Sequence, residues 1–130
     1  MVRQEFHVRN YWKVVVYWNI DYDLFDIILQ ELISKGFSAE VLNEIKEHME
    51  NGHAKAATIS NVKEHISCIL FNRHKDKEDY INSIVHESVY VKQAMLEAYD
   101  VEDSGEAPAY TMGYLVSKML EIFRKLNYVR

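Results

Sequence analysis

The chain has very few of the residues that cross-link or interrupt protein structure. It holds one cysteine, one proline and four glycines among its 130 residues. A single cysteine excludes an internal disulfide, and the place of Cys68 in the apolar run "ISCILF" predicts a buried free thiol, compatible with a reducing compartment. The sequence has no internal repeat and no low-complexity segment, so we expect an ordinary folded domain.

Long apolar runs are missing as well. The longest uninterrupted ones are "VVVYW" and "CILF", far shorter than the roughly 20 residues that cross a bilayer. The start, "MVRQEFHVRN", lacks the basic region and long apolar run of a secretory signal. These absences predict a cytoplasmic protein without a membrane partner.

Clusters of basic residues are the third absence. The net charge is −5 and the pI is near 5.6, and the lysines and arginines are scattered among acidic residues. Nucleic-acid-binding domains usually carry clustered lysine and arginine on one face. The sequence therefore predicts no nucleic-acid partner.

The size and composition of the chain fit a single domain that spans residues 1–130. Hydrophobic residues make up 48% of the chain, enough to bury a core at this size. The β-branched and aromatic run Trp12–Ile20 predicts a strand that begins between Phe6 and Trp12. A helix closed by Gly36 should follow, and Ser38 should open a second helix that ends before Gly52. The apolar face of the first helix comprises Leu24, Ile27, Ile28 and Leu32.

The second half is predicted to hold two hairpin strands and two helices, at His53–Ser60, His65–Asn72, Lys77–Tyr99 and Gly105–Leu126. Asp76 is a suitable N-cap for the long helix, and Pro108 is tolerated in the first turn of the last one. The predicted order is β-α-α-β-β-α-α. This order predicts an α+β fold in which a small sheet packs against helices.

One stretch of the long helix points to metal chemistry. In "IVHESVYVKQ", His86 and Glu87 begin the pattern H-E-x-x-H, but Tyr90 replaces the second histidine. Residues four apart share a helix face, so side chains 86 and 90 could bind one ion, and Glu87 could accept a proton from bound water. We expect the 100–105 connection to bring Glu106 back to this face as a third ligand.

The segment around this motif resembles the C-terminal half of small zincin-like, metallopeptidase-like proteins found in phages and prophages. In those proteins a strand precedes the H-E-x-x-H helix, and an acidic residue and an A-Y-x-x-G-Y or A-Y-x-x-G-W pattern follow. His86, Glu87, Glu106 and "AYTMGY" (Ala109–Tyr114) match this pattern, and the resemblance covers roughly residues 65–120. It implies a minimal zincin-like domain in a bacterial host cell or a virion.

Tyr90 is the departure from that family pattern. A phenol with a reference pKa near 10 is a poor zinc ligand, so we expect His86, Tyr90 and Glu106 to bind zinc weakly. Three interpretations stay open: a zincin scaffold with a degenerate site, a working site with an unusual ligand, and a helix that never held a metal. His65 and His74 could reach the helix, although surface or hydrogen-bonding roles are more usual for such histidines.

Two functions compete at this stage. The first is a non-enzymatic accessory or interaction protein whose partner is another protein or a second copy of itself. The alternative is a minimal zinc-dependent peptidase or amide hydrolase with a peptide substrate and Glu87 as general base.

The sequence also predicts how four side chains pack. We expect Tyr110 and Tyr114 to lie in the core with hydroxyls at the edge of the site, and Ile84 and Val85 to anchor the long helix to "ISCILF".

Overall fold

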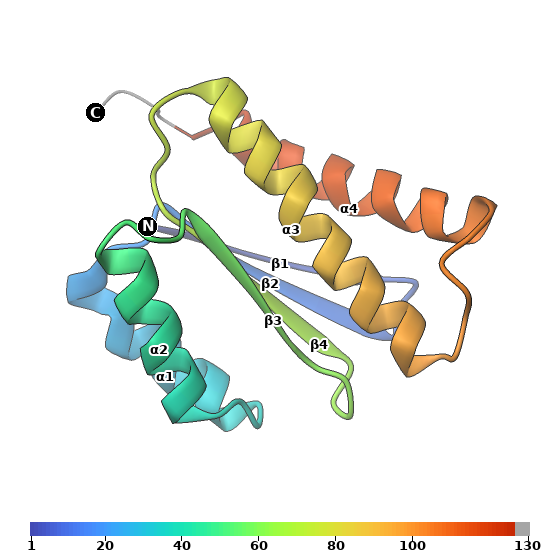
Figure 1. The fold of residues 1–130 in the computed structure, drawn as a ribbon, viewed down its shortest axis with the longest axis horizontal. Helices are drawn as coiled ribbons and strands as arrows, with labels where there is room; N and C mark the ends of the chain where they lie inside the picture. Colours follow the sequence, from blue (N-terminus) through green and yellow to red (C-terminus); the bar gives the residue numbers. More distant parts are fainter. Residues whose placement is uncertain (127–130) are drawn as a thin grey trace.

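The computed structural model describes residues 1–126 as an α+β domain, which confirms the predicted fold class. A four-stranded mixed sheet packs against two pairs of helices (Figure 1). A short 3-10 helix, Tyr22–Leu24, leads into the first helix. The elements are β1 Val2–Val8, β2 Trp12–Trp18, α1 Phe25–Ser34, α2 Ala39–Glu50, β3 Ala56–Asn61, β4 Ile66–Phe71, α3 Lys77–Ala98 and α4 Glu106–Phe123.

Strand β1 is the element that the sequence did not lead us to expect. Its side chains alternate, with Gln4, Phe6 and Val8 buried and their neighbours exposed. The turn into β2 places Arg9 and Asn10 at positive φ angles of 54° and 66°. Tight hairpin turns require this conformation and usually contain glycine, so a turn without glycine concealed the hairpin.

The sheet joins two hairpins through a parallel pair. Its strand order is β1-β2-β4-β3, with β1/β2 and β3/β4 antiparallel and β2/β4 parallel. The crossover from one hairpin to the other carries α1 and α2. Strands β1 and β3 therefore form the two edges of the sheet.

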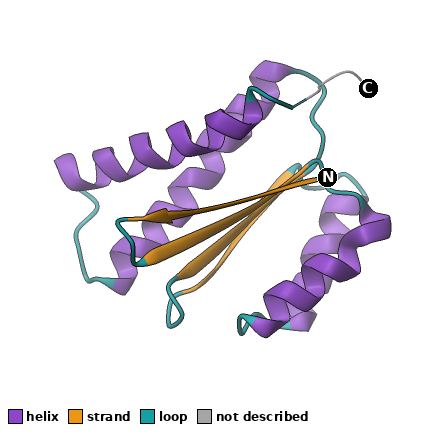
Figure 2. Cartoon of the chain, turned by 180° about the vertical axis from the view of Figure 1, so that it is seen from behind, coloured by secondary structure: helices purple, strands orange, loops and turns teal. Residues whose placement is uncertain are grey.

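Helices cover both faces of the sheet (Figures 1 and 2). Val15, Tyr17 and Leu70 pack with α1 and α2, whereas Val14, Trp18 and Phe71 pack with α3 and α4. The central strands are thus apolar on both sides, which explains the near-continuous apolar runs "VVVYW" and "CILF". Cys68 is buried and free, as predicted.

Two predictions about side-chain orientation are corrected. Ile84 is fully buried, but Val85 is 41% exposed and anchors nothing, because α3 packs on the sheet along one stripe and adjacent positions are about 100° apart. Tyr110 is 69% exposed and Tyr114 is 39% exposed, so neither lies in the core. The buried stripe of α4 instead comprises Pro108, Thr111, Leu115, Met119 and Phe123.

The start of α3 agrees with the sequence, and the helix ends at Ala98 where the sequence predicts Tyr99. Asp76 caps α3 by accepting a hydrogen bond from the Asp79 amide at 2.8 Å. Within residues 1–126, no helix has both the length and the apolar character needed to span a membrane.

Candidate functional site

His86 and Tyr90 lie on one face of α3, as their spacing predicted. Their rings are 5.2 Å apart and nearly perpendicular. The His86 side chain is 65% exposed and Tyr90 is 47% exposed. One turn of an exposed helix face therefore presents an imidazole and a phenol together to solvent.

Glu87 turns from this face toward strand β3. The Thr58 hydroxyl donates a hydrogen bond to Glu87 Oε1 at 3.0 Å, and His86 Nε2 lies 3.9 Å from the other carboxylate oxygen. Burial raises the pKa of Glu87, although the Thr58 hydrogen bond and the nearby His86 oppose that shift. The carboxyl group therefore links α3 to the edge of the sheet and binds a proton more readily than an exposed glutamate.

The edge strand beside this carboxyl group has an open row of backbone groups. The Asn72 amide donates to the Lys55 carbonyl at 2.9 Å, and Ala57 and Ile59 lie opposite Leu70 and Cys68. Because bonding alternates along an antiparallel strand, odd-numbered residues of β3 bond to β4. Within residues 1–126, the outward N–H and C=O groups of the alternate residues have no backbone partner; these residues are Ala56, Thr58 and Ser60.

Glu106 lies at the other edge of the sheet. It begins α4 and lines a groove with the β1–β2 turn, together with Val8 and Arg9, whereas Glu87 contacts β3. Helix α3 continues from His86 to Ala98, which adds about 18 Å along its axis at 1.5 Å per residue. The structure thus places Glu106 beside the β1–β2 turn, whereas His86 lies on α3 next to the carboxylate that contacts β3, and the expected juxtaposition is corrected.

His65 and His74, the two histidines beside β4, make contacts within the fold. The Tyr99 hydroxyl lies 3.1 Å from His65 Nδ1, and the His65 ring stacks on Trp12. The two ring nitrogens of buried His74 each lie 2.7 Å from a polar oxygen, the Asn72 carbonyl and the Ser83 hydroxyl. These contacts explain both positions without a metal.

The side chains present do not fit a zinc site. Within the part of the chain that the structure describes, no three His, Cys, Asp or Glu residues come close enough to hold a metal ion. A zinc site of the catalytic kind needs three protein ligands and an open position. With Glu106 at the opposite edge and Tyr90 in place of histidine, His86 stands without the partners that the family pattern implies.

Sequence reasoning missed Thr58 and the edge to which it belongs. The sequence predicts a hairpin strand at His53–Ser60, and the structure forms it at Ala56–Asn61, but its edge position depends on the parallel pairing of β2 and β4. No local signal marked this edge, because the segment lacks the charge and proline that usually protect an edge strand.

Comparisons of this chain with protein-family models, with curated proteins and with solved structures found no match. The resemblance to zincin-like proteins stays a prediction that rests on the motif residues. Functional inference for this chain therefore rests on the geometry of α3 and β3.

Proposed function

We propose that this protein is a non-enzymatic interaction protein that binds an extended segment of a partner protein as an added strand along β3. The observation that supports it is the row of outward backbone groups at Ala56, Thr58 and Ser60. An added strand would pair with this row, and main-chain hydrogen bonds of this kind supply affinity in strand-addition complexes.

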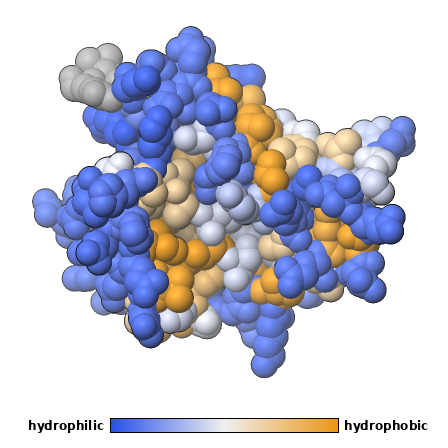
Figure 3. Space-filling view, viewed as in Figure 1, coloured by the Kyte–Doolittle hydropathy of each residue, from blue (hydrophilic) through white to orange (hydrophobic). Residues whose placement is uncertain are grey.

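The surroundings of β3 suit such a partner. The strand lies between α2 and α3 in Figure 1, and in the same view the surface between these helices is pale, of intermediate hydropathy, with apolar patches at its borders (Figure 3). On α3, Glu87 accepts a hydrogen bond from Thr58 of β3, and His86 lies 3.9 Å from the Glu87 carboxylate. In strand addition, flanking side chains select alternate residues of the added strand, so the side chains of His86 and Glu87 would determine part of its specificity.

The alternative is the minimal zinc-dependent hydrolase. One observation favours it: burial raises the pKa of Glu87 beside His86, and general bases often have such shifted pKa values. However, Glu106 lines the groove beside β1, which leaves the expected ligand set incomplete. Strand binding needs no group that lies elsewhere in the fold, so we favour it.

The test is selection of binding peptides from a random library, followed by hydrogen exchange. We expect selected peptides to protect the outward amides of Thr58 and Ser60 from exchange, because these amides become hydrogen-bonded. Ala56→Pro removes one outward donor without removing a bond to β4, so it should weaken binding and leave thermal unfolding nearly unchanged.

A matched control is Ala39→Pro in the exposed first turn of α2, where a spare donor tolerates proline. This variant should bind the selected peptides as the unmodified protein does. Selected peptides that protect no amide of β3, or that bind Ala56→Pro with unchanged affinity, would refute strand addition at this edge.

A further inference from the structure

A groove lies at the opposite edge of the sheet and has no part in the proposed strand binding. It runs between the β1–β2 turn and the first half of α4 and has a volume of about 960 Å³, within the range of small-ligand and short-peptide sites. Ala109 and the rings of Tyr110 and Tyr114 contribute apolar surface, and Arg9 and Glu106 stand among the lining residues. It is thus an apolar groove with one charge of each sign.

One side of the groove belongs to an acidic part of the chain. From residue 93 to residue 117 the sequence has no Lys, Arg or His, and it holds five acidic residues: Glu97, Asp100, Glu102, Asp103 and Glu106. Asp103 pairs with Lys92 at 3.0 Å. Among the ion pairs formed by residues 1–126, none includes Glu106 or Arg9, so the Glu106 carboxylate is available to a cation.

An unpaired aromatic ring accompanies this carboxylate. Tyr110 follows Glu106 by four residues on the same helix face and is 69% exposed. Within residues 1–126 it has no hydrogen bond or aromatic ring contact, whereas Tyr114 donates its hydroxyl to the His7 carbonyl and has Lys118 over its ring. Tyr114 therefore forms a fixed wall, and Tyr110 is free to contact a ligand.

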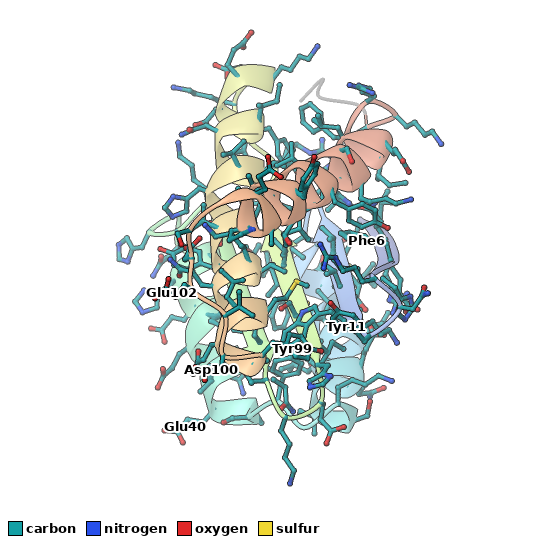
Figure 4. The ribbon with its side chains drawn as sticks, turned by 90° about the vertical axis from the view of Figure 1, so that its right-hand side faces the viewer. Phe6, Tyr11, Glu40, Tyr99, Asp100 and Glu102 are labelled. Atoms are coloured by element: carbon teal, nitrogen blue, oxygen red, sulfur yellow. The ribbon has the colours of Figure 1, made fainter. Side chains whose placement is uncertain are left out.

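More tyrosines stand beside the acidic connection between α3 and α4. Tyr11 and Tyr99 are 5.1 Å apart and are 45% and 39% exposed. Figure 4 shows them side by side, with Asp100 and Glu102 on the neighbouring connection. This end of the molecule thus combines exposed aromatic rings with acidic groups, a combination that suits a guanidinium, which stacks on rings and pairs with carboxylates.

Gly113 lines the groove and, having no side chain, leaves space in it. A Cβ atom added there would meet no other atom within 4 Å, so close packing within the chain does not require glycine. Glycine inside a helix is less favourable than alanine, yet here its missing side chain leaves room beside Ala109 and Val8. An apolar side chain of a ligand could occupy that space.

We propose that this groove binds an arginine-bearing segment of a partner protein, with the guanidinium over Tyr110 and against Glu106 and an adjacent apolar side chain over Gly113. The site is separate from the β3 edge. Because Arg9 repels the same guanidinium from the other wall, it lowers the affinity that Glu106 and Tyr110 provide.

The test uses a fluorescent, acetylated and amidated seven-residue peptide with two arginines around one leucine, measured by anisotropy. We expect saturable binding below about 1 mM that weakens as salt is added. Tyr110→Ala should weaken binding about fivefold, Glu106→Gln about threefold, and Arg9→Gln should strengthen it about twofold. The same peptide with glutamates in place of arginines should not bind.

The β3-edge variant Ala56→Pro is the control that separates the two proposals, because it should bind this peptide unchanged. The proposal is overturned if the arginine peptide does not bind, if the glutamate peptide binds equally well, or if Arg9→Gln weakens binding. It is also overturned if sedimentation shows a dimer that Tyr110→Ala dissociates, since a second copy of the chain would then occupy the groove.

Discussion

The two edges of the sheet differ in how their backbone groups are protected. On β1, Arg3 and Glu5 pair with each other, and Arg3 also binds Glu31 through two hydrogen bonds of 3.0 and 2.7 Å. The Tyr114 hydroxyl caps the His7 carbonyl. Strand β3 carries neither a charged residue nor a proline. Charged side chains protect edge strands against unwanted pairing, so this molecule protects one edge and leaves the other open to a partner strand.

The carboxyl groups that contact the two edges also differ in the direction of their pKa shifts. Burial opposes ionisation of Glu31, but hydrogen bonds from Arg3 and Tyr17 outweigh it, and the pKa of Glu31 is lowered. Burial dominates at Glu87, where the pKa is raised. Glu31 therefore stabilises the folded protein when ionised, whereas ionisation of Glu87 destabilises it.

The largest expected effect comes from detaching α3 from the sheet. Ile84→Asp places an unpaired charge where the isoleucine is fully buried, and it should lower the free energy of unfolding by about 4 kcal/mol. The adjacent Val85→Asp, at a 41% exposed position, should change it by less than about 0.5 kcal/mol. Urea denaturation of both variants measures the difference, and equal losses would contradict the packing of α3.

A smaller loss is expected when the protected edge is opened. Arg3→Ala removes the partner of Glu5 and Glu31, and it should lower the free energy of unfolding at pH 7 by about 1 kcal/mol, because the arginine is partly exposed.

The pH dependence of this edge sharpens the prediction. The lowered pKa values of Glu5 and Glu31 add stability above their unfolded value of about 4.3, and that stability disappears as pH falls through the folded pKa values. The unmodified protein should therefore lose more stability than Arg3→Ala between neutral and acidic pH. Parallel acid denaturation curves would show that the network contributes nothing.

The open edge should show the reverse behaviour. Glu87 has a raised pKa, so its contribution is fully present below the unfolded pKa and is lost as pH rises through the folded value. Glu87→Gln keeps a carbonyl oxygen for Thr58, and it should raise the free energy of unfolding at pH 7 by up to about 1 kcal/mol. The gain should vanish near pH 4. Guanidinium denaturation at pH 7 and at pH 4 tests this, and an equal gain at both pH values would contradict the prediction.

The smallest effect is expected at the groove beside the protected edge. Gly113→Ala adds a methyl group that meets no other atom, so it should raise the free energy of unfolding by roughly 0.5–1 kcal/mol. The same methyl group should weaken binding of the arginine peptide. A variant that is more stable and binds normally would show that the ligand does not use this part of the groove.

Local patterns predicted most of the elements because each pattern has a local cause. The cap at Asp76 depends on residues within a few positions. The predicted apolar face of the first helix was wrong in part, because Leu24 and Ile27 are exposed and the buried side chains are Phe25, Ile28 and Leu32. The β1 hairpin was not predicted from the sequence, because its turn places Arg9 and Asn10 at positive φ and contains no glycine. The edge position of β3 was not predicted either, because it follows from the pairing of β2 with β4, which lie far apart in the chain.

The candidate site was predicted in part for the same reason. The spacing of His86 and Tyr90 fixed their common face, because an i, i+4 relation is a property of the helix itself. The position of Glu106 depended on where α3 ends and on the direction in which α4 leaves it. The six residues 100–105 are long enough, when extended, to span the distance from Tyr99 back to His86, so the sequence could not show on which side Glu106 lies.

The parallel pair at the centre of the sheet has a consequence for folding kinetics. Each hairpin joins strands that are neighbours in the sequence, whereas β2 and β4 meet only after α1 and α2 have been traversed. Contacts between distant segments require closure of a long loop, which slows folding. Each hairpin can therefore form locally and early, and the rate-limiting step should be the docking of the two hairpins along Val15 and Cys68. Until that step is complete, β2 and β4 also present unpaired edges, so aggregation during folding should depend on the docking rate more than on native stability.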